Sequence, residues 1–374
     1  MRTLKDDIIA LIQLEGPMPV ERYMALCLGH PVLGYYMTRD PFGVEGDFIT
    51  APEISQMFGE LIGLWAAQVW IDMGRPHGVG LVEIGPGRGT LMADALRAVR
   101  KAVSGMPGAI DIRMVETSPV LRARQQAALG QADVAARWHT DIATALHGPV
   151  IIIANELLDA LPVRQVLRTA HGDVRRVVGL GENGELAFGF EGGRRSADTT
   201  PALLIEEPDA ADVLIGQLAS HLAREQGAAL FIDYGAEHGD AGDTLQAVRR
   251  HAFVDPLADP GLADLTTQVR FGRAMATARA GGARVHGLVT QADFLMRLGL
   301  AERATTLKRA ASLAGMRDID DAVLRLTRMD ERGKSGAGMG ALFKAMCFSH
   351  PSLMAIPGFD RPERDAGVAR IVET

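Results

Sequence analysis

The chain has 374 residues, of which 47% are hydrophobic and 23% charged, a composition typical of a folded globular protein with a large core. The formal net charge of −7 argues against a nucleic-acid-binding surface, which needs clustered Lys and Arg. Two widely separated cysteines, Cys27 and Cys347, argue against a disulfide framework and favour a reducing compartment such as the cytoplasm. No apolar stretch reaches the ~20 residues of a membrane span, so we expect no membrane insertion.

The first part of the chain is predicted to be helical around one loop. Helical periodicity covers residues 3–29 and 53–73, and a stretch rich in Gly, Pro and aromatic residues at 34–50 separates them. We therefore expect residues 1–75 to form an N-terminal helical region.

From about residue 79 the pattern changes to an alternation of strands and helices. Apolar runs predict strands at 80–84, 110–115, 150–154, 229–232 and 284–288, with a last strand at 341–348. Helices are predicted at 90–103, 119–129 and 210–224. Such alternation predicts an α/β fold with a doubly wound, mostly parallel, Rossmann-like sheet.

Two insertions are expected to interrupt this domain, which we place at residues 76–350. The first, at about 163–205, alternates apolar and polar residues around Asn183-Gly184, a strong hairpin signal, and residues 193–209 are predicted to be a loop. The second insertion, at about 291–335, has the pattern of amphipathic helices. Residues 351–374 are predicted to be a tail.

The most informative segment is a glycine-rich turn between the strand at 80–84 and the helix predicted to follow it. Thr90 is a residue type that favours the N-cap position, so we expect it to cap that helix. Glycines at every second position let the backbone approach a ligand closely, but their spacing differs from the G-x-G-x-x-G of dinucleotide-binding folds. A nicotinamide-dependent oxidoreductase is therefore disfavoured. The candidate cofactor-binding residues here are Glu83, Gly85, Pro86, Gly87 and Gly89.

Two later segments are placed to complete a nucleoside site. Glu116 ends an apolar run about one βαβ unit after the glycines, where an acid binds the ribose hydroxyls in nucleotide-binding sheets. The alternative is a solvated Glu at the end of a strand. Asp141 and Ile142 fall where such folds usually contact adenine, with the carboxylate accepting from the amino group and Ile142 stacking on the ring.

Polar residues follow the apolar strand at 150–154. Ligands of open α/β sheets bind at the carboxyl ends of the strands, so Asn155, Glu156 and Asp159 are candidate catalytic residues. A carboxylate binds two N–H groups of a guanidinium, which stays charged because its pKa exceeds about 12. If the substrate is a guanidinium, we expect Glu156 to bind and orient it, with Asn155 and Asp159 in support. Alternatively the three residues cap the next helix, and Asp233 is then the next candidate.

Several motifs in this order resemble the MidA-type family of class I S-adenosylmethionine-dependent methyltransferases, whose mitochondrial members act in respiratory complex I assembly. The resemblance covers most of residues 20–350, and one departure is Ala51, where the family more often has Ser. The matching motifs are residues 46–55, 58–60, 83–91, 155–162, 231–235, 255–261 and 264–266.

The resemblance implies S-adenosyl-L-methionine as cofactor, and symmetric dimethylation of an arginine on the 49-kDa-type subunit of NADH:ubiquinone oxidoreductase. It also implies that a loop carrying Asp47, Phe48 and Thr50 folds over the cofactor. Since no Arg- and Ser-rich presequence is seen, we expect a cytoplasmic bacterial member, whereas eukaryotic relatives would lie in the mitochondrial matrix.

Two other functions fit the same residues, a non-catalytic assembly factor on a methyltransferase fold and a methyltransferase that acts on a small molecule. The sequence contains no C-x-x-C or H-E-x-x-H motif, so we expect no metal site. Nothing in it indicates the oligomeric state.

Overall fold

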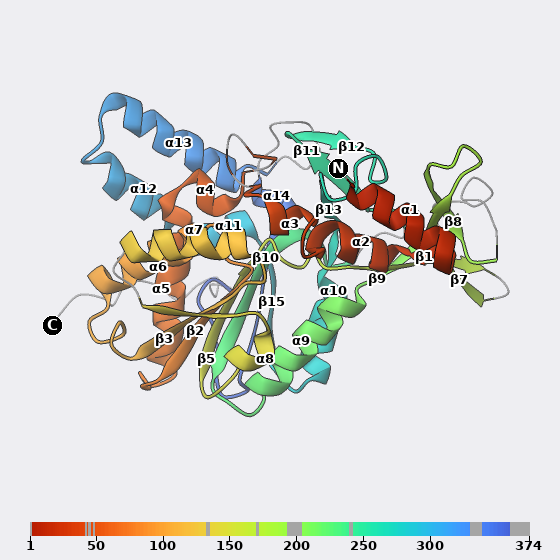
Figure 1. The fold of residues 1–374 in the computed structure, drawn as a ribbon. Coiled ribbons are helices and arrows are strands. Elements are labelled where there is room, and N and C mark those ends of the chain that lie inside the picture. The colour runs from red at the N-terminus through yellow and green to blue at the C-terminus, as the bar shows by residue number, and fades with distance from the viewer. Residues whose placement is uncertain are drawn as a thin grey trace.

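A computed structural model describes residues 2–359 except 42, 44–45, 48, 132–134, 170–171, 193–203, 239–241 and 330–338. Its centre is an eight-stranded sheet with the order β15-β16-β10-β5-β2-β3-β4, and the short strand β14 pairs with the end of β10 (Figure 1). These strands are β2 (Val79–Ile84), β3 (Ile110–Val115), β4 (Ala136–His139), β5 (Val150–Asn155), β10 (Gly227–Ala236), β14 (Val269–Arg270), β15 (Arg284–Thr290) and β16 (Phe343–Ser349).

The strand order confirms the predicted doubly wound sheet. Strands β4, β3, β2, β5 and β10 are parallel neighbours, and β16 lies antiparallel between β10 and β15. The chain runs outward from β2 to β4 and then returns to β5 on the other side of β2. That reversal is a topological switch point, where open α/β sheets bind ligands beyond the carboxyl ends of their strands.

Both faces of the sheet are covered by helices, which explains why its strands are apolar without interruption (Figure 1). One face packs against α5 (Gln56–Asp72), α6 (Thr90–Ala102), α7 (Pro119–Gln131), α11 (Gln291–Arg297), α12 (Leu300–Lys308), α13 (Leu313–Thr327) and α14 (Met339–Leu342). The other face packs against α8 (Ile142–Ala145), α9 (Asp209–Leu222) and α10 (Phe271–Ala280). No helix in the described ranges is long and apolar enough to cross a membrane.

A second lobe forms where the N-terminal helices meet the first insertion (Figure 1). Its larger sheet has the order β1-β7-β6-β9, with β8 on β7, and its smaller sheet has the order β12-β11-β13. Its helices are α1 (Leu4–Glu15), α2 (Val20–Gly29) and α3 (Tyr35–Thr38), whereas α4 (Ala51–Ile54) packs beside α5 against the core of the central sheet. The strands are β1 (Met18–Pro19), β6 (Arg164–Thr169), β7 (Gly172–Leu180), β8 (Leu186–Phe190), β9 (Leu204–Glu207), β11 (Gln246–Arg249), β12 (Ala252–Val254) and β13 (Asp264–Thr266).

Several local features differ from the sequence prediction. The helical stretch at 3–29 is broken at Gly16, whose φ of 88° ends α1, and β1 separates it from α2. The predicted loop at 193–209 contains β9 at its end, because these four residues pair with β6. Strands β11 to β13 have three or four residues each and were not predicted, since so short a run has no readable period.

Gly227 is where β10 enters the sheet beside β5, with φ 147°. A Cβ at this position would lie 1.8 Å from the Val150 carbonyl oxygen, so backbone would have to shift. We expect Gly227→Ala to lower the free energy of unfolding by about 3 kcal/mol in urea titrations. Gly105→Ala is the matched control: its φ is also positive at 91° but nothing lies within 4 Å, so only about 1 kcal/mol is expected. An equal loss of unfolding free energy in both variants would contradict the close approach of Gly227 to the Val150 carbonyl.

Candidate active site

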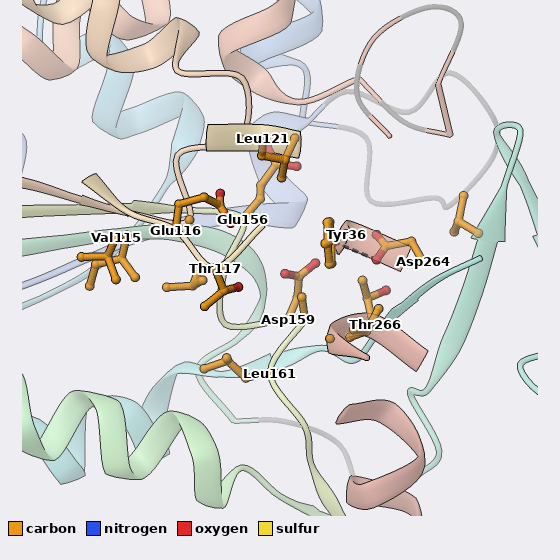
Figure 2. Close-up of a pocket in the computed structure, with 18 of the residues that line it drawn as sticks. Tyr36, Val115, Glu116, Thr117, Leu121, Glu156, Asp159, Leu161, Asp264 and Thr266 are labelled. Atoms are coloured by element: carbon orange, nitrogen blue, oxygen red, sulfur yellow. Dashed lines mark hydrogen bonds between the residues drawn. The ribbon is translucent and has the colours of Figure 1, made fainter. Parts of the chain in front are cut away.

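A cavity of about 440 Å³ lies beyond the carboxyl ends of β2, β3 and β5, at the predicted switch point (Figure 2). The glycine turn and Glu116 line its sheet side. The second lobe lines the opposite side through α2, α3, β11 and β13. The cavity is therefore formed between the two lobes of one chain.

The glycine turn adopts backbone conformations that favour glycine. Gly85, Gly87 and Gly89 all have positive φ, at 66°, 53° and 83°. Gly85 and Gly87 line the cavity, whereas a Cβ at Gly89 would lie 3.2 Å from the Cα of Gln125 on α7. The first two glycines thus face the cavity, and the third permits close packing of α7. The Pro86 carbonyl accepts from the Gly89 N–H at 2.8 Å and closes the turn.

Helix α6 begins at Thr90, but its N-cap is Gly89, so the prediction that Thr90 caps the helix is wrong. The Thr90 hydroxyl instead donates to Glu53 Oε1 at 2.6 Å. No side chain caps the start of α6 within the described residues. The first N–H groups of the helix therefore stay available for an anionic group.

A second, smaller cavity of about 40 Å³ adjoins the first, since Gly85, Gly87 and Glu156 line both. Among the described residues, Glu83 Oε2 and Asn155 Oδ1 are buried here without a hydrogen-bond partner. Burial, aided by the charge of Glu116, raises the pKa of Glu83 to about 8. Two unpartnered acceptors fit an ammonium group, which offers three N–H donors and no acceptor. These residues therefore suit the amino-acid end of S-adenosylmethionine.

Glu116 lines the large cavity, as predicted for a ribose-binding acid. Its Oε1 accepts from the Ser118 N–H at 2.7 Å and its Oε2 accepts from Gln125 Nε2 at 3.0 Å. These two bonds fix the carboxylate and leave lone pairs for a ligand. The Ser118 hydroxyl also donates to the Tyr36 carbonyl at 2.6 Å, which ties this loop to the second lobe.

Asp141 and Ile142 are not brought to the site, because neither lines the two cavities. Asp141 is exposed and its Oδ1 accepts from the Ala143 N–H at 2.9 Å, so it caps α8. Ile142 packs against the core cluster that also contains buried residues of α9 and α10. Their adenine contact stays a prediction.

The turn after β5 holds the catalytic candidates and is anchored from β10. Glu156 has φ 52°, a left-handed conformation that costs a non-glycine residue about 1–3 kcal/mol. Asp233 is 1% exposed, and its Oδ2 accepts from the Leu157 and Leu158 N–H groups at 3.0 and 2.8 Å. Its Oδ1 accepts from the Tyr234 N–H at 2.9 Å. Asp233 lines neither cavity, and these hydrogen bonds position the turn, while its role as the alternative substrate-binding acid stays a prediction.

The two carboxylates on this turn face the large cavity (Figure 2). Glu156 Oε1 accepts from the Ala51 N–H at 3.2 Å and from Asn155 Nδ2 at 3.1 Å, and burial raises the pKa of Glu156 to about 8. Because Ala51 contributes its backbone N–H, the presence of Ala where the family more often has Ser leaves this bond unaffected. Asp159 Oδ1 is buried with no partner in the described structure, and burial raises the Asp159 pKa well above its ordinary value.

The far end of the cavity contains polar residues that the sequence analysis did not single out as a site. Tyr36 donates its hydroxyl to Asp264 Oδ1 at 2.8 Å (Figure 2). Tyr234 donates its hydroxyl to Thr266 Oγ1 at 2.9 Å. Gln246 Nε2 donates to the Tyr234 hydroxyl at 2.8 Å. The sequence feature that could have identified them is the motif at residues 264–266, one of those that carry the family resemblance. Its polar side chains lie on β13.

Four carboxylates therefore line one cavity, those of Glu116, Glu156, Asp159 and Asp264, and its lining in the described residues includes no Lys, Arg or His. Burial also raises the Asp264 pKa to about 7. Within the same described residues, no three His, Cys, Asp or Glu side chains are grouped so as to hold a metal ion. Such a cavity attracts a cation and repels an anion.

The loop predicted to cover the cofactor is only partly described. Asp47 is buried and lines neither cavity. Its Oδ2 accepts from the Tyr35 hydroxyl and its Oδ1 from the Arg250 N–H, both at 2.7 Å. Thr50 lines the small cavity, and Phe48 lies outside the described residues. Asp47 thus joins the loop to the smaller sheet, and its predicted cofactor contact stays a prediction.

Comparisons with known proteins agree with this geometry. The model of the S-adenosyl-L-methionine-dependent methyltransferase family Methyltransf_28 matches residues 61–289. The zebrafish (Danio rerio) "Protein arginine methyltransferase NDUFAF7, mitochondrial" is 37% identical over 78% of this chain and 75% of its own length. The Drosophila melanogaster homologue of that name is 35% identical over 79% and 75%. A Burkholderia thailandensis crystal structure with S-adenosyl-homocysteine bound has a TM-score of 0.81, at 29% identity over 95% and 94% of the two chains.

The first test of the site concerns Glu116. Glu116→Ala removes the acceptor expected to bind the ribose, so S-adenosyl-homocysteine should bind more weakly by about 1–3 kcal/mol. Isothermal titration calorimetry measures this directly, with NAD as a second ligand that should not bind comparably. Unchanged affinity in the variant would remove Glu116 from the cofactor site.

The second test concerns pH. Since the Glu156 pKa is about 8, this group loses its proton as the pH rises from 6 to 9 and becomes attractive to a cation. S-adenosylmethionine carries a sulfonium charge that S-adenosyl-homocysteine lacks. The ratio of their affinities should therefore rise with pH by about tenfold, equivalent to one pKa unit of coupling. Titrations of Glu156→Gln should show a flatter dependence, and the same slope in both proteins would exclude Glu156 as the titrating group.

Proposed function

The chain belongs to the MidA-type family of class I S-adenosylmethionine-dependent methyltransferases, and we propose that it methylates the guanidinium group of a protein arginine. It is an S-adenosylmethionine-dependent methyltransferase, as its family and the S-adenosyl-homocysteine-bound neighbour indicate. The open question is which acceptor it uses.

The charge of the large cavity is the observation that favours arginine. Four carboxylates line it and no described lining residue is a cation, so a cationic acceptor would stabilise their ionised forms, which a neutral or anionic acceptor cannot do. Guanidinium is permanently charged and offers five N–H donors in a planar fork that matches carboxylates. The names of the relatives, protein arginine methyltransferases, point the same way.

Glu156 is the residue we propose to hold and orient the acceptor. It lines both cavities, and its Oε1 is already fixed by the Ala51 and Asn155 donors, so Oε2 is left for the guanidinium. When bound, S-adenosylmethionine supplies an electrophilic methyl group on a sulfonium. A nitrogen that gains this methyl must release a proton. Glu156, with its raised pKa, suits the role of acceptor for it.

Asp159 contributes a second carboxylate, and the unpartnered Oδ1 suits another N–H group of the same guanidinium. Asn155 supports Glu156 through its Nδ2, as expected from the sequence, while its Oδ1 faces the small cavity. The arrangement favours catalysis over a purely structural assembly factor. A protein without a ligand would gain nothing from burying the Oδ1 atoms of Asn155 and Asp159 without hydrogen-bond partners.

The protein substrate is proposed from the resemblance alone, as the 49-kDa-type subunit of NADH:ubiquinone oxidoreductase with a symmetrically dimethylated arginine. We further propose the cytoplasm as the compartment, in keeping with two buried and free cysteines. Mass spectrometry of that subunit from cells with and without the gene tests the substrate. An unmodified arginine in both would reject the subunit, and methylation of a small molecule alone would favour the rival acceptor class.

Glu156→Gln separates transfer from cofactor binding. The amide keeps the size of the side chain but cannot accept a proton, so single-turnover transfer to an arginine acceptor should fall by about 10²–10⁴-fold. Affinity for S-adenosyl-homocysteine should stay within about tenfold. Asp159→Asn should lower the transfer rate less than Glu156→Gln does and should raise KM more, because it removes a carboxylate that binds the substrate. The exposed Glu191→Gln on the first insertion is the matched control and should transfer normally. A normal rate in Glu156→Gln would contradict the proposed role.

A further inference from the structure

One face of the smaller sheet forms a wall of the cavity and continues beyond it. Gln246 and Val248 on β11 line the cavity together with Asp264 and Thr266 on β13. In the register, Val248 lies opposite Asp264 on one side and opposite Phe253 on the other. Directly opposed residues of antiparallel strands place their side chains on the same face. Phe253 therefore extends the row that starts at the cavity carboxylate Asp264.

The strand that carries Phe253 is an exposed edge. Strand β12 is the outermost strand of its sheet, and all three of its residues are exposed, with Phe253 at 73% (Figure 1). Proteins usually protect free edges with Lys, Pro or a covering element. The Ala252–Val254 edge contains none of these residues, and no described strand pairs with its outer side.

The hairpin geometry decides which backbone groups of β12 point outward. Arg250 and His251 both have left-handed φ, at 50° and 60°, as in a two-residue type I′ turn. The flanking pair in such a hairpin, here Arg249 and Ala252, is hydrogen-bonded. The next pair, Val248 and Phe253, is then not hydrogen-bonded. The N–H and C=O groups of Phe253 consequently point away from β11, toward the open edge.

This turn is held in place by the loop next to the cofactor site. Asp47 accepts from the Arg250 N–H at 2.7 Å through Oδ1, and from the His251 N–H at 3.1 Å through its backbone carbonyl. Arg249 also donates to Asp259 at 2.7 Å. Left-handed conformations at non-glycine residues persist only where the surroundings enforce them, and they cluster at ligand clamps. The edge is thus fixed relative to the cavity before any partner arrives.

We propose that β12 binds an extended segment of the substrate protein as an added strand, and that an arginine of this segment enters the acidic cavity. The choice of arginine as the side chain that enters the cavity rests on the proposed arginine methylation. An added strand uses main-chain hydrogen bonds for affinity and leaves specificity to side chains. Here Phe253 offers the outward backbone groups and an apolar ring, while the four carboxylates select the cation. The enzyme would then recognise arginine in unfolded or loop segments and not on a helix.

Binding of a labelled peptide tests the docking independently of catalysis. The probe is a fluorescein-labelled nine-residue peptide of Val and Thr with one central Arg, and fluorescence anisotropy is read in the presence of S-adenosyl-homocysteine. Phe253→Pro removes the outward N–H and the ring but no hydrogen bond of the β11 ladder, so the ladder should survive and the peptide Kd should rise about tenfold. Leu313→Ala on α13, which is also highly exposed at 80%, is the control and should bind normally.

N-methylation of the peptide backbone gives a second and sharper readout. An added strand directs alternate N–H groups toward its partner, so methylation at positions of one parity should weaken binding while the other parity has no effect. Calorimetry with S-adenosyl-homocysteine, expected to change less than about twofold, verifies that Phe253→Pro is folded. Wild-type binding in Phe253→Pro, or equal effects of both parities, would overturn edge docking. A peptide that binds but gains no methyl would contradict arginine methylation and leave the docking intact.

Discussion

The Asp233 carboxylate is the interaction on which the site depends. It comes from the end of β10 and accepts N–H groups from Leu157 and Leu158, so it fixes the turn that follows the neighbouring strand β5. That turn contains Glu156 in a left-handed conformation and Asp159 with an unpartnered oxygen. Without a hydrogen-bond acceptor at this point, two buried N–H groups would be unsatisfied. Nothing would then offset the strain of the left-handed conformation in this turn. One buried carboxylate thereby positions two others at the switch point of the sheet.

Unbalanced negative charge is the second organising feature. Burial raises the pKa of Glu83, Glu156 and Asp264 toward or above neutrality, so the ligand-free protein reduces its repulsion by holding protons. A cationic ligand reverses this, because it favours the ionised form and releases those protons. The cofactor and the proposed guanidinium acceptor would each bring positive charge to the same group of acids. Their binding is therefore expected to be linked to pH through the same carboxylates.

The second lobe supplies the side of the cavity that we propose binds the methyl acceptor. Tyr36, Gln246 and Asp264 come from segments far apart in sequence, yet they line one end of a single cavity. The small sheet that carries two of them also presents the free edge at Phe253. Asp47 connects that sheet to the loop beside the cofactor. The proposed cofactor-covering loop, acceptor site and docking edge are consequently parts of one contiguous structure.

The sequence by itself determined the sheet, the glycine turn and the acids at the ends of β3 and β5, since continuous apolar runs, glycine spacing and polar strand ends are local signals. Tertiary structure decided the rest. Thr90 loses its capping role to a contact with Glu53, and Asp141 caps α8 away from both cavities. Asp233 turns out to anchor a loop, which only the parallel pairing of β5 and β10 makes possible. The wall formed by β11 and β13 depends on pairings between short strands, and register between such strands is set by three-dimensional packing and leaves no period in the sequence.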